Sequence, residues 1–388
     1  MPKEVAYFDY AATTPLDPDV LKAMLPFFSD SFGNPSSIHY AGQRAEAAVE
    51  QARSEVSTLL NANQYEITFT SGATESNNLV LRGLAHQRKA QTGATRLLTT
   101  AVEHISVLRT CRQLETQEGY IVELLPIDSE GQVDVKQLSE YLREDTALVS
   151  AVYANNEIGT INPIAKIGTL CRERGIPFHT DAAQAANHLD LDVDELNVDF
   201  MTLGAHKFYG PKGVGVLYHR KYDPIISGQT GGSQEFGTRA GTHNVPSIIG
   251  FSESLQIARS MMSDFTAQII PLRDKIIDTV LSQIPEVRLS GHRHHRLPNH
   301  ASFVFKNVDT NQLLAALDVA GFACSSGSAC KTGNPEPSPI LLSLGYTPDW
   351  ALGALRVTLG RKSSKIEVDA FLLALPSILE RLRSEHLS

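Results

Sequence analysis

Short apolar runs alternate with amphipathic stretches along the first half of the chain. Seven runs have the length and composition of buried strands: 66–70, 96–100, 121–125, 147–153, 176–180, 199–203 and 214–218. Helical spacing separates them, as at 164–174, and residues 36–60 predict an earlier helix capped by Ser36 or Ser37. Strands that alternate with helices indicate a large, mostly parallel α/β sheet. Because the later strands crowd together, we expect an antiparallel member near Val214.

The pattern changes after about residue 225. Residues 226–244 are rich in Gly, Ser and Thr and predict a long loop, which a helix at 245–282 follows. Short strands around a helix at 310–319 come next, and a last helix begins at Ser364. Pro376 is expected to kink or break that helix. This part of the sequence predicts a second, smaller α/β domain.

Composition narrows the class of protein. The chain has 388 residues, of which 42% are hydrophobic and 20% charged, as in globular proteins. Its net charge of −9 argues against a nucleic-acid partner. No apolar run approaches the roughly 20 residues that a membrane helix needs, so we expect no membrane partner. The four cysteines form no disulfide framework and the first residues lack a secretory core, which predicts a cytoplasmic location.

A lysine among small residues follows the strand at 199–203. Lys207 stands in the sequence Leu-Gly-Ala-His-Lys-Phe-Tyr-Gly-Pro-Lys-Gly, which ends at Gly213. Burial at a strand end lowers the pKa of an amine and leaves it free for Schiff-base chemistry. A lysine in a surface turn is the alternative for this segment taken alone.

Three further segments place polar groups at strand ends. Asp181 follows the strand at 176–180, where an acid can keep a pyridinium nitrogen protonated, or can simply cap a helix. The turn at 70–77 opens a helix whose amide groups and Thr74 hydroxyl suit a phosphate, although many turns carry such residues. His104 is placed to lie over a cofactor ring, with a core histidine as the alternative. Phosphate cradle, acid and lysine in this order form the constellation of a pyridoxal phosphate enzyme.

Several motifs together resemble one family. They lie at 7–15, 32–37, 71–77, 155–159, 180–184, 206–213, 239–242 and 325–330. Over nearly its whole length the chain is similar to the NifS/IscS group of cysteine desulfurases, which are fold-type-I pyridoxal phosphate enzymes. The Ser-Ser-Gly-Ser-Ala-Cys motif ending at Cys330 resembles the first of two desulfurase groups, whose catalytic cysteine sits in a longer, mobile loop.

The resemblance implies a cofactor site for pyridoxal 5'-phosphate. Lys207 would bind the cofactor covalently, Asp181 would pair with the ring nitrogen, and Gln184 would hydrogen-bond the ring hydroxyl. His104 would stack on the ring. The phosphate would be held by Ala73, Thr74 and His206, and by Thr242 from the other subunit of a homodimer. The family commonly has Ser or Thr where this chain has Gly204, so one phosphate hydroxyl is missing here.

The resemblance also implies a substrate site and a domain plan. Asn155 would lie beside cofactor and substrate, and Arg356 would bind the substrate carboxylate. Residues 16–260 would form the large cofactor-binding domain with its mostly parallel seven-stranded sheet. Residues 261–388 would form the small domain that carries the catalytic cysteine, and residues 1–15 would pack with it.

The four cysteines and one histidine tract have different expected roles. Cys111 and Cys171 lie in helical patterns and Cys324 ends an apolar run, so core packing is expected for all three. Cys330 lies in a polar, glycine-rich segment, where nearby positive charge such as Lys331 would favour the thiolate. The histidines His292, His294 and His295 lack a cysteine or carboxylate pattern, so we expect a solvated loop and no metal.

The expected activity is that of a cysteine desulfurase. Lys207 and His104 would move protons, and Cys330 would take the sulfur of L-cysteine as a persulfide and release L-alanine. Sulfur-acceptor proteins, including an iron–sulfur scaffold, are the implied partners. Three alternatives stay open: a selenocysteine lyase, an aminotransferase without a nucleophilic cysteine, and a sulfur carrier that uses Cys330 but has no need of Lys207.

Overall fold

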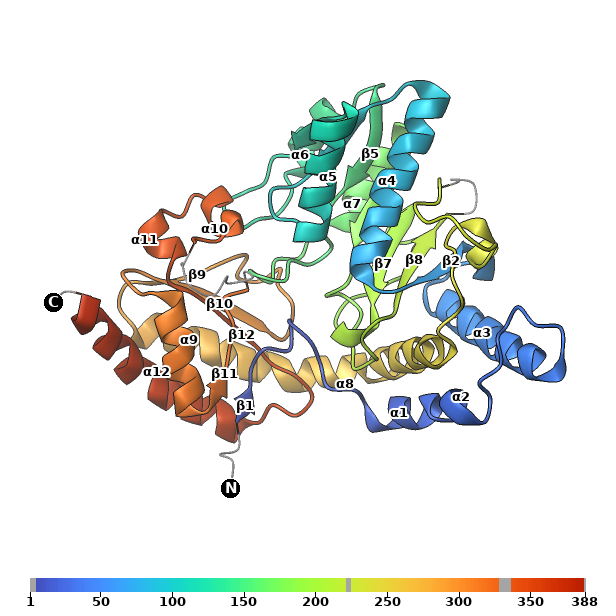
Figure 1. The fold of residues 1–388 in the computed structure, drawn as a ribbon. Coiled ribbons are helices and arrows are strands. Elements are labelled where there is room, and N and C mark those ends of the chain that lie inside the picture. Colours follow the sequence, from blue (N-terminus) through green and yellow to red (C-terminus); the bar gives the residue numbers. More distant parts are fainter. Residues whose placement is uncertain (1–4, 221–224, 328–335, 387–388) are drawn as a thin grey trace.

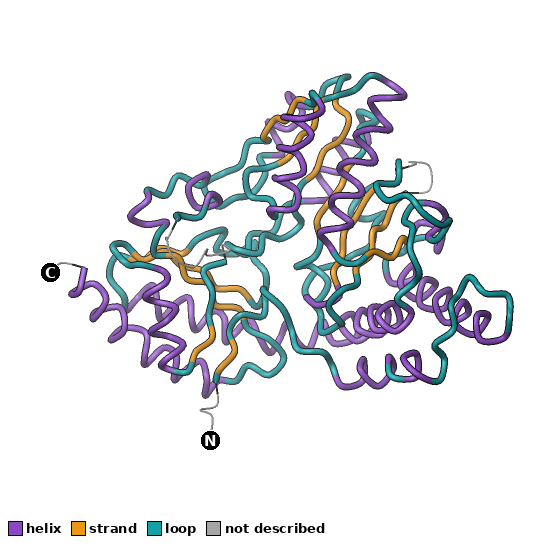
Figure 2. The backbone as a smooth tube through the Cα atoms, in the orientation of Figure 1, coloured by secondary structure: helices purple, strands orange, loops and turns teal. Residues whose placement is uncertain are grey.

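The computed structural model describes residues 5–220, 225–327 and 336–386. Two groups of strands are visible in it, each with helices packed around it (Figure 2). The helix α8 (Val245–Gln283) connects them (Figure 1). It packs against α3 (Tyr40–Leu59) of the larger group and against β9 (Val287–Leu289), β10 (His300–Phe305) and α12 (Lys365–His386) of the smaller one. Residue 260, the predicted domain boundary, falls inside α8, and the division into domains stays a prediction.

The larger sheet has seven strands in the described part of the chain, in the order β2-β8-β7-β6-β5-β3-β4. They are β2 (Ile67–Thr70), β3 (Arg96–Thr99), β4 (Ile121–Leu124), β5 (Thr146–Ser150), β6 (Phe178–Asp181), β7 (Phe200–Gly204) and β8 (Gly215–His219). β8 runs antiparallel to β2 and β7, whereas the other pairs are parallel. The connection from β7 to β8 is too short for a crossover helix, which forces the antiparallel pairing. The predicted sheet is therefore confirmed, including its antiparallel member.

Helices cover both faces of this sheet. Apolar side chains of α4 (Ala73–Thr92) and α5 (Ile105–Glu118) form a core against one face. The other face packs against α3 (Tyr40–Leu59), α6 (Val135–Tyr141), α7 (Ile164–Glu173) and the first half of α8. Since apolar residues recur at helical spacing on one side of each helix, that side faces the sheet and the rest faces solvent.

The start of α3 differs from the prediction. The helix begins at Tyr40, and its cap is His39, whose Nδ1 accepts from the Gly42 N–H at 3.3 Å. Ser36 and Ser37 belong instead to a turn that Asn34 closes, with its side chain accepting from Ser36 N–H and its carbonyl from Ser37 N–H. A side-chain turn of this kind competes with helix formation, so the expected serine cap was wrong.

The smaller sheet has three antiparallel strands among the described residues, in the order β12-β10-β9. Its strands are β9 (Val287–Leu289), β10 (His300–Phe305) and β12 (Ala354–Thr358), and β1 (Ala6–Tyr7) pairs separately with β11 (Phe322–Ala323). The helices α8, α9 (Thr310–Ala320) and α12 (Lys365–His386) close one core with this sheet. The remaining helices and turns are short: α1 (Pro18–Met24), α2 (Pro26–Ser29), α10 (Pro339–Ser343), α11 (Pro348–Ala351), η1 (Gln64–Glu66), η2 (Ala205–Lys207) and η3 (Glu235–Gly237).

Pro376 was expected to kink or break the last helix, and the helix continues past it, so the break does not occur. A proline inside a helix costs about 3 kcal/mol because it removes one hydrogen bond and crowds the preceding turn. Phe371, Leu375 and Leu379 on either side of it are buried in the smaller core. Each such buried side chain contributes roughly 1.5–3 kcal/mol, so packing outweighs the loss and α12 stays one helix.

Candidate active site

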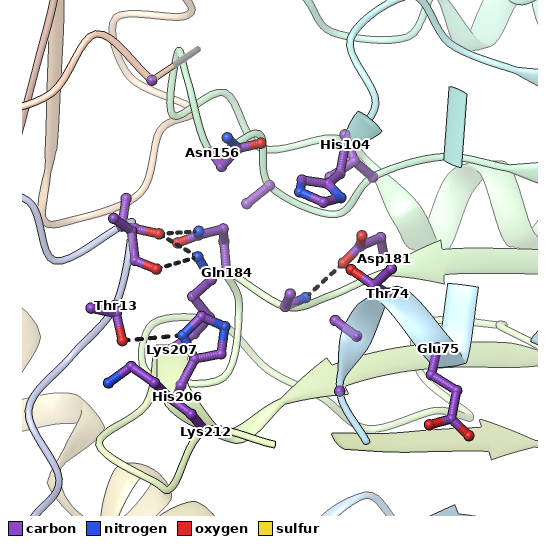
Figure 3. A pocket seen from close by; sticks show the side chains of 18 of the residues that line it. Thr13, Thr74, Glu75, His104, Asn156, Asp181, Gln184, His206, Lys207 and Lys212 are labelled. Carbon is purple, nitrogen blue, oxygen red and sulfur yellow. Dashed lines mark hydrogen bonds between the residues drawn. The ribbon is translucent and has the colours of Figure 1, made fainter. Parts of the chain in front are cut away.

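A cavity of about 700 Å³ opens at the carboxyl ends of β6 and β7. Its wall includes the first turn of α4, His104, Asn156 and Arg356 of β12. Residues 11–13 also line it, and they belong to the segment 8–14, which we call the N-terminal strap. Figure 3 shows that Lys207, Asp181, Gln184 and His104 surround the same space. Ligands of α/β proteins bind at such carboxyl edges, so the location agrees with a catalytic site.

Lys207 lies in η2, directly after β7. Its Nζ donates to the carbonyl oxygens of Ala11 at 2.6 Å and Ala12 at 2.9 Å, both in the N-terminal strap. Burial and the charge of Arg356 lower the pKa of the Lys207 amine to about 8, although Asp181 and Asp9 act in the opposite direction. The amine is thus a nucleophile close to neutral pH, as Schiff-base chemistry requires.

Asp181 ends β6 and is almost completely buried. Its Oδ2 accepts from Asn77 Nδ2 at 2.7 Å, and its Oδ1 accepts from the Ala183 N–H at 3.0 Å. Asn77 also donates to Ser106 Oγ at 2.9 Å, which lies 2.7 Å from Nδ1 of His104. A continuous hydrogen-bond network therefore connects Asp181 to His104 beneath the cavity.

The network contains two residues that the sequence analysis did not assign to the site. Asn77 belongs to the 71–77 motif, and Ser106 stands two residues after His104 at the start of α5. The available signal was helical spacing, since Asn77 lies one turn beyond Ala73 and Thr74 on α4. Their contacts with Asp181 and His104 depend on how α4 and α5 pack, which no local motif contains.

His104 caps the N-terminus of α5 and lines the cavity. The Ser106 N–H donates to its Nδ1 at 3.2 Å, so Nδ1 is the acceptor and the neutral ring carries its proton on Nε2. The capping contact fixes both the tautomer and the orientation of the ring.

The helix α4 begins at the cavity without a side-chain cap. Its N-cap is Gly72, at a φ of 149°, and Gly72, Ala73 and Thr74 all line the cavity. The first N–H groups of a helix have no partner inside it and carry partial positive charge, which makes an uncapped end a phosphate site. A Cβ at Gly204 would lie 3.3 Å from the Cβ of Ala73, so a side chain at position 204 would reach the same end of α4.

His206 and Gln184 face the N-terminal strap. Nδ1 of His206 lies 3.2 Å from Thr13 Oγ1. Burial, then the charges of Lys207 and Lys212, lower the pKa of His206 to about 4, so its ring is neutral near pH 7. Gln184 Nε2 donates to the Ala11 oxygen at 2.8 Å. Both side chains line the cavity and hold the strap across it.

Arg356 projects from β12, and its side chain is 4% exposed. Nη2 pairs with Asp9 Oδ1 at 2.7 Å, and Nη1 donates to the Asn156 oxygen at 2.8 Å. Its Nε has no hydrogen-bond partner among the described residues. A buried guanidinium with unused donors on a cavity wall is suited to a carboxylate ligand.

Two predicted site residues do not line the cavity, and a third is not among the described residues. Asn155 is fully buried and does not line the cavity, because its side chain binds the Val102 oxygen and the N–H groups of the following turn. Its neighbour Asn156 lines the cavity instead. Thr242 is exposed in the 226–244 loop, away from the cavity of its own chain. Cys330 lies outside the described residues.

The other cysteines are poor nucleophiles. Burial raises the pKa of the Cys111 thiol to about 12 and that of Cys171 well above its usual range. Burial also raises the pKa of Cys324, and the charge of Asp9 raises it further. Cys324 packs at the edge of the smaller core. None of the three described cysteines is therefore a thiolate near pH 7.

In residues 5–220, 225–327 and 336–386, no group of three or more His, Cys, Asp and Glu side chains is arranged to hold a metal. Nδ1 of His292 instead accepts from the N–H groups of His294 and His295. Within the same ranges, no helix combines the length and the apolar character needed to cross a membrane.

The cavity residues fit pyridoxal 5'-phosphate. Lys207 supplies an amine of lowered pKa, and Asp181 supplies an anion for a ring nitrogen. The uncapped end of α4 supplies free N–H groups for a phosphate. Each of these groups lines the same cavity, so the donor set matches the three polar parts of the cofactor.

Comparison with known proteins identifies the family. A family model described as aminotransferase class-V matches residues 6–371. The cysteine desulfurase IscS of Clostridium botulinum is 43% identical over 385 residues, which cover 99% of this chain and 96% of that protein. The protein of the same name from Dictyoglomus turgidum is 44% identical over 382 residues, 98% of this chain and 96% of that protein.

Solved structures agree with these relatives. A NifS-like protein has a TM-score of 0.90 at 34% identity, over 97% of this chain and 100% of that chain. SspA in complex with cysteine has a TM-score of 0.79 at 36% identity, over 91% of this chain and 98% of that chain. The expected fold type and resemblance are thereby confirmed. The chain belongs to the class-V aminotransferase family and, within it, to the pyridoxal-phosphate-dependent cysteine desulfurases.

Proposed function

We propose that this desulfurase removes sulfur from L-cysteine with Lys207, Asp181 and His104 at the cofactor, Arg356 at the substrate carboxylate and Cys330 as sulfur acceptor. One observation carries the proposal: an amine with a pKa of about 8, a buried acid and a buried arginine meet in one cavity. Amine, acid and arginine are the groups needed to bind an amino acid at the cofactor and to move its α-proton.

Each side chain then has a defined task. When bound, pyridoxal 5'-phosphate accepts the electrons left when the α-proton of the amino acid departs. The Lys207 amine takes up and returns protons, because a pKa of about 8 lets it do both near neutral pH. Ser106 holds the His104 ring in place through Nδ1, which leaves Nε2 as the nitrogen that can transfer a proton. Arg356 binds the carboxylate and so orients the α-carbon.

The sulfur transfer is balanced without an outside oxidant. The Cys330 thiolate forms an S–S bond with the substrate sulfur while the C–S bond of the substrate breaks. The proton lost from the Cys330 thiol is balanced by a proton added to the carbon, which becomes the methyl group of L-alanine. The products are L-alanine and a persulfide on Cys330, so every atom of L-cysteine and the thiol is accounted for.

Two serine variants test the assignment of the nucleophile. Cys330→Ser should bind L-cysteine and keep the cofactor spectrum but lose sulfide release in the presence of reductant. Cys324→Ser is the matched control and should keep most activity, because the raised pKa of this partly buried thiol leaves it protonated and a poor nucleophile. Mass spectrometry after incubation with L-cysteine should find one added sulfur on the Cys330 peptide. Sulfur on Cys324 alone, or full activity of Cys330→Ser, would contradict the proposal.

We propose that the enzyme is a homodimer in which Thr242 reaches the cofactor phosphate of the partner subunit. Exposed apolar residues support a subunit contact, since Ile38 is 93% and Phe32 74% exposed. Phe236, at 56% exposure, precedes Thr242 in the same loop and packs against Tyr65. Sedimentation should give twice the 42.3 kDa of one chain, and Thr242→Ala should bind the cofactor more weakly. A fully active monomer would refute the dimer.

We further propose that the persulfide passes to sulfur-acceptor proteins in the cytoplasm, an iron–sulfur scaffold among them. The support is the family resemblance together with a composition that lacks a disulfide framework. Affinity capture with the wild-type enzyme under conditions that preserve persulfides should retain an acceptor that Cys330→Ser does not label with sulfur. Equal labelling by both proteins would contradict this transfer.

A further inference from the structure

We propose that Asp9 is a positioning residue for substrate recognition, holding the Arg356 guanidinium in the orientation that receives the carboxylate of L-cysteine. The inference rests on the proposed role of Arg356. It assigns a function to an acid of the N-terminal strap that takes no part in the chemistry described above. Asp9 and Arg356 are 347 residues apart in sequence and 2.7 Å apart in the structure.

Burial explains why the arginine needs a fixed counter-ion. The Arg356 side chain is 4% exposed and that of Asp9 is 21% exposed. Of the described carboxylates, only Asp9 lies within ion-pair distance of Arg356. A buried charge without a partner is strongly unfavourable. Without Asp9 the guanidinium would keep one hydrogen bond to the described part of the chain, the one to the Asn156 oxygen. Asp9 therefore determines where the guanidinium lies before substrate arrives.

Backbone contacts of the N-terminal strap fix the position of Asp9. Asp9 forms a parallel bridge with Thr358, and the Ala11 N–H donates to Thr358 Oγ1 at 2.9 Å. The Asp9 carbonyl accepts from Tyr7 Oη and from the Ala12 N–H, both at 3.0 Å. Arg356 precedes Thr358 by two positions on β12, so both side chains leave the same face of the strand. The pairing of the strap with β12 thus places Asp9 next to Arg356.

The contact leaves the arginine able to bind a ligand. A guanidinium has five N–H groups, and Asp9 and the Asn156 oxygen accept one each, from Nη2 and Nη1. One hydrogen remains on each of these nitrogens, and Nε has no partner among the described residues. Two neighbouring N–H groups of a guanidinium can engage a carboxylate bidentately. The strap that carries Asp9 also holds Lys207 through Ala11 and Ala12. Asp9 thereby fixes the arginine relative to the amine.

Steady-state kinetics of the loaded enzyme test the inference. Asp9→Ala should raise the KM for L-cysteine about tenfold, equivalent to 1.4 kcal/mol, and change kcat by less than about threefold. The reason is that a carboxylate contact is made equally before and during the reaction. Asp9→Asn keeps an acceptor oxygen and should give a smaller rise. Binding of cysteamine, which lacks the carboxylate, should shift the cofactor absorbance at the same concentration in Asp9→Ala and wild type.

Asp17→Asn is a matched control. Asp17 pairs with Arg361 at 2.9 Å, so it joins the same two regions of the chain, but neither residue lines the cavity. Thermal unfolding should show losses of stability in Asp17→Asn and Asp9→Asn, whereas only Asp9→Asn should raise KM. An unchanged KM in Asp9→Ala, or equal rises in the two asparagine variants, would overturn the inference.

Arg356→Lys separates this inference from the proposed function. A lysine cannot form the two-point contact, so KM should rise, and adding Asp9→Ala should then have little further effect. If Arg356→Lys leaves KM unchanged, the proposed role of Arg356 fails. If Arg356→Lys raises KM but Asp9→Ala does not, the proposed function stands and the inference about Asp9 fails.

Discussion

Arg53 holds the loop that carries Thr242, and replacing it should destabilise the enzyme. Arg53 belongs to α3, and its side chain is buried. The guanidinium donates to Glu235 Oε2 at 2.8 Å and Oε1 at 2.9 Å, and to the Ile67 oxygen at 2.7 Å. It lies 5.0 Å from the ring centre of Phe69 and 5.2 Å from that of Phe236. Glu235 belongs to the 226–244 loop, so this ion pair attaches the loop to the large sheet.

The size of the expected loss of stability follows from the pKa of Glu235. Burial acts to raise the pKa of Glu235, but the hydrogen bonds from Arg53 and His243 prevail and lower it from 4.5 to about 2. Because the folded pKa is the lower one, this stabilisation is complete above about pH 4.5 and is lost as the pH falls towards 2. At 1.36 kcal/mol per pKa unit the shift corresponds to about 3 kcal/mol. Removing one partner of a buried pair costs about 3–5 kcal/mol, which agrees.

Arg53→Met is the variant to measure, by urea unfolding of the loaded enzyme at pH 7.5 and one fixed protein concentration. We expect the free energy of unfolding to fall by about 3–4 kcal/mol. Glu50→Gln is the control, because Glu50 contacts the same arginine at 3.1 Å but is 45% exposed and should cost less than about 1 kcal/mol. Adding Glu235→Gln to Arg53→Met should restore part of the loss, since no unpaired charge then remains. Equal losses in Arg53→Met and Glu50→Gln would refute the reasoning.

Four further predictions concern the cavity. Lys207→Ala should lose the visible absorbance of covalently bound cofactor and all turnover; a cofactor that borohydride still attaches to the protein would point to another lysine. In the cofactor-free enzyme, acylation of Lys207 followed by peptide mass mapping should be half-maximal near pH 8, because the neutral amine predominates above its pKa, and a midpoint near 10.5 would contradict this. Asn77→Ala should lower kcat about tenfold, since a hydrogen bond to a charged group such as Asp181 contributes about 1.5–3 kcal/mol, and an unchanged kcat would show that the network is dispensable. Gly204→Ser should slow the loss of cofactor on dialysis a few-fold, because it adds a hydroxyl near the N-terminus of α4. The new Cβ would lie 3.3 Å from the Cβ of Ala73, so a faster loss would mean that Ala73 does not move to make room.

Local patterns predicted the strands well, because the central strands β5, β6 and β7 are short runs buried on both faces, although the edge strand β4 is largely exposed. The antiparallel β8 was predictable from its spacing along the chain, since the segment between Gly204 and Gly215 is too short for a crossover. The N-terminus of α3 was not. Ser36 is a good cap in isolation, but Asn34 draws it into a turn. The choice between two polar residues depended on a competing local contact.

Within the site, residues at strand ends were easier to predict than residues that meet through packing. Lys207 and Asp181 follow apolar runs, so their places at the carboxyl edge could be expected. Asn155 and Asn156 are adjacent and chemically identical, and only the turn decides that Asn156 faces the cavity. The contact of Asp9 with Arg356 crosses almost the whole chain and has no local signal.

The long sequence separation between the N-terminal strap and β12 has a consequence for synthesis on the ribosome. The site cannot be completed until Arg356 has been made, 347 residues after Asp9. At about 5–20 residues per second this delay is roughly 17–70 seconds. During that time the large sheet can fold while residues 8–14 have no β12 to pair with. The strap therefore stays unpaired throughout elongation, and the wall of the cavity is complete only once the strap and β12 have met.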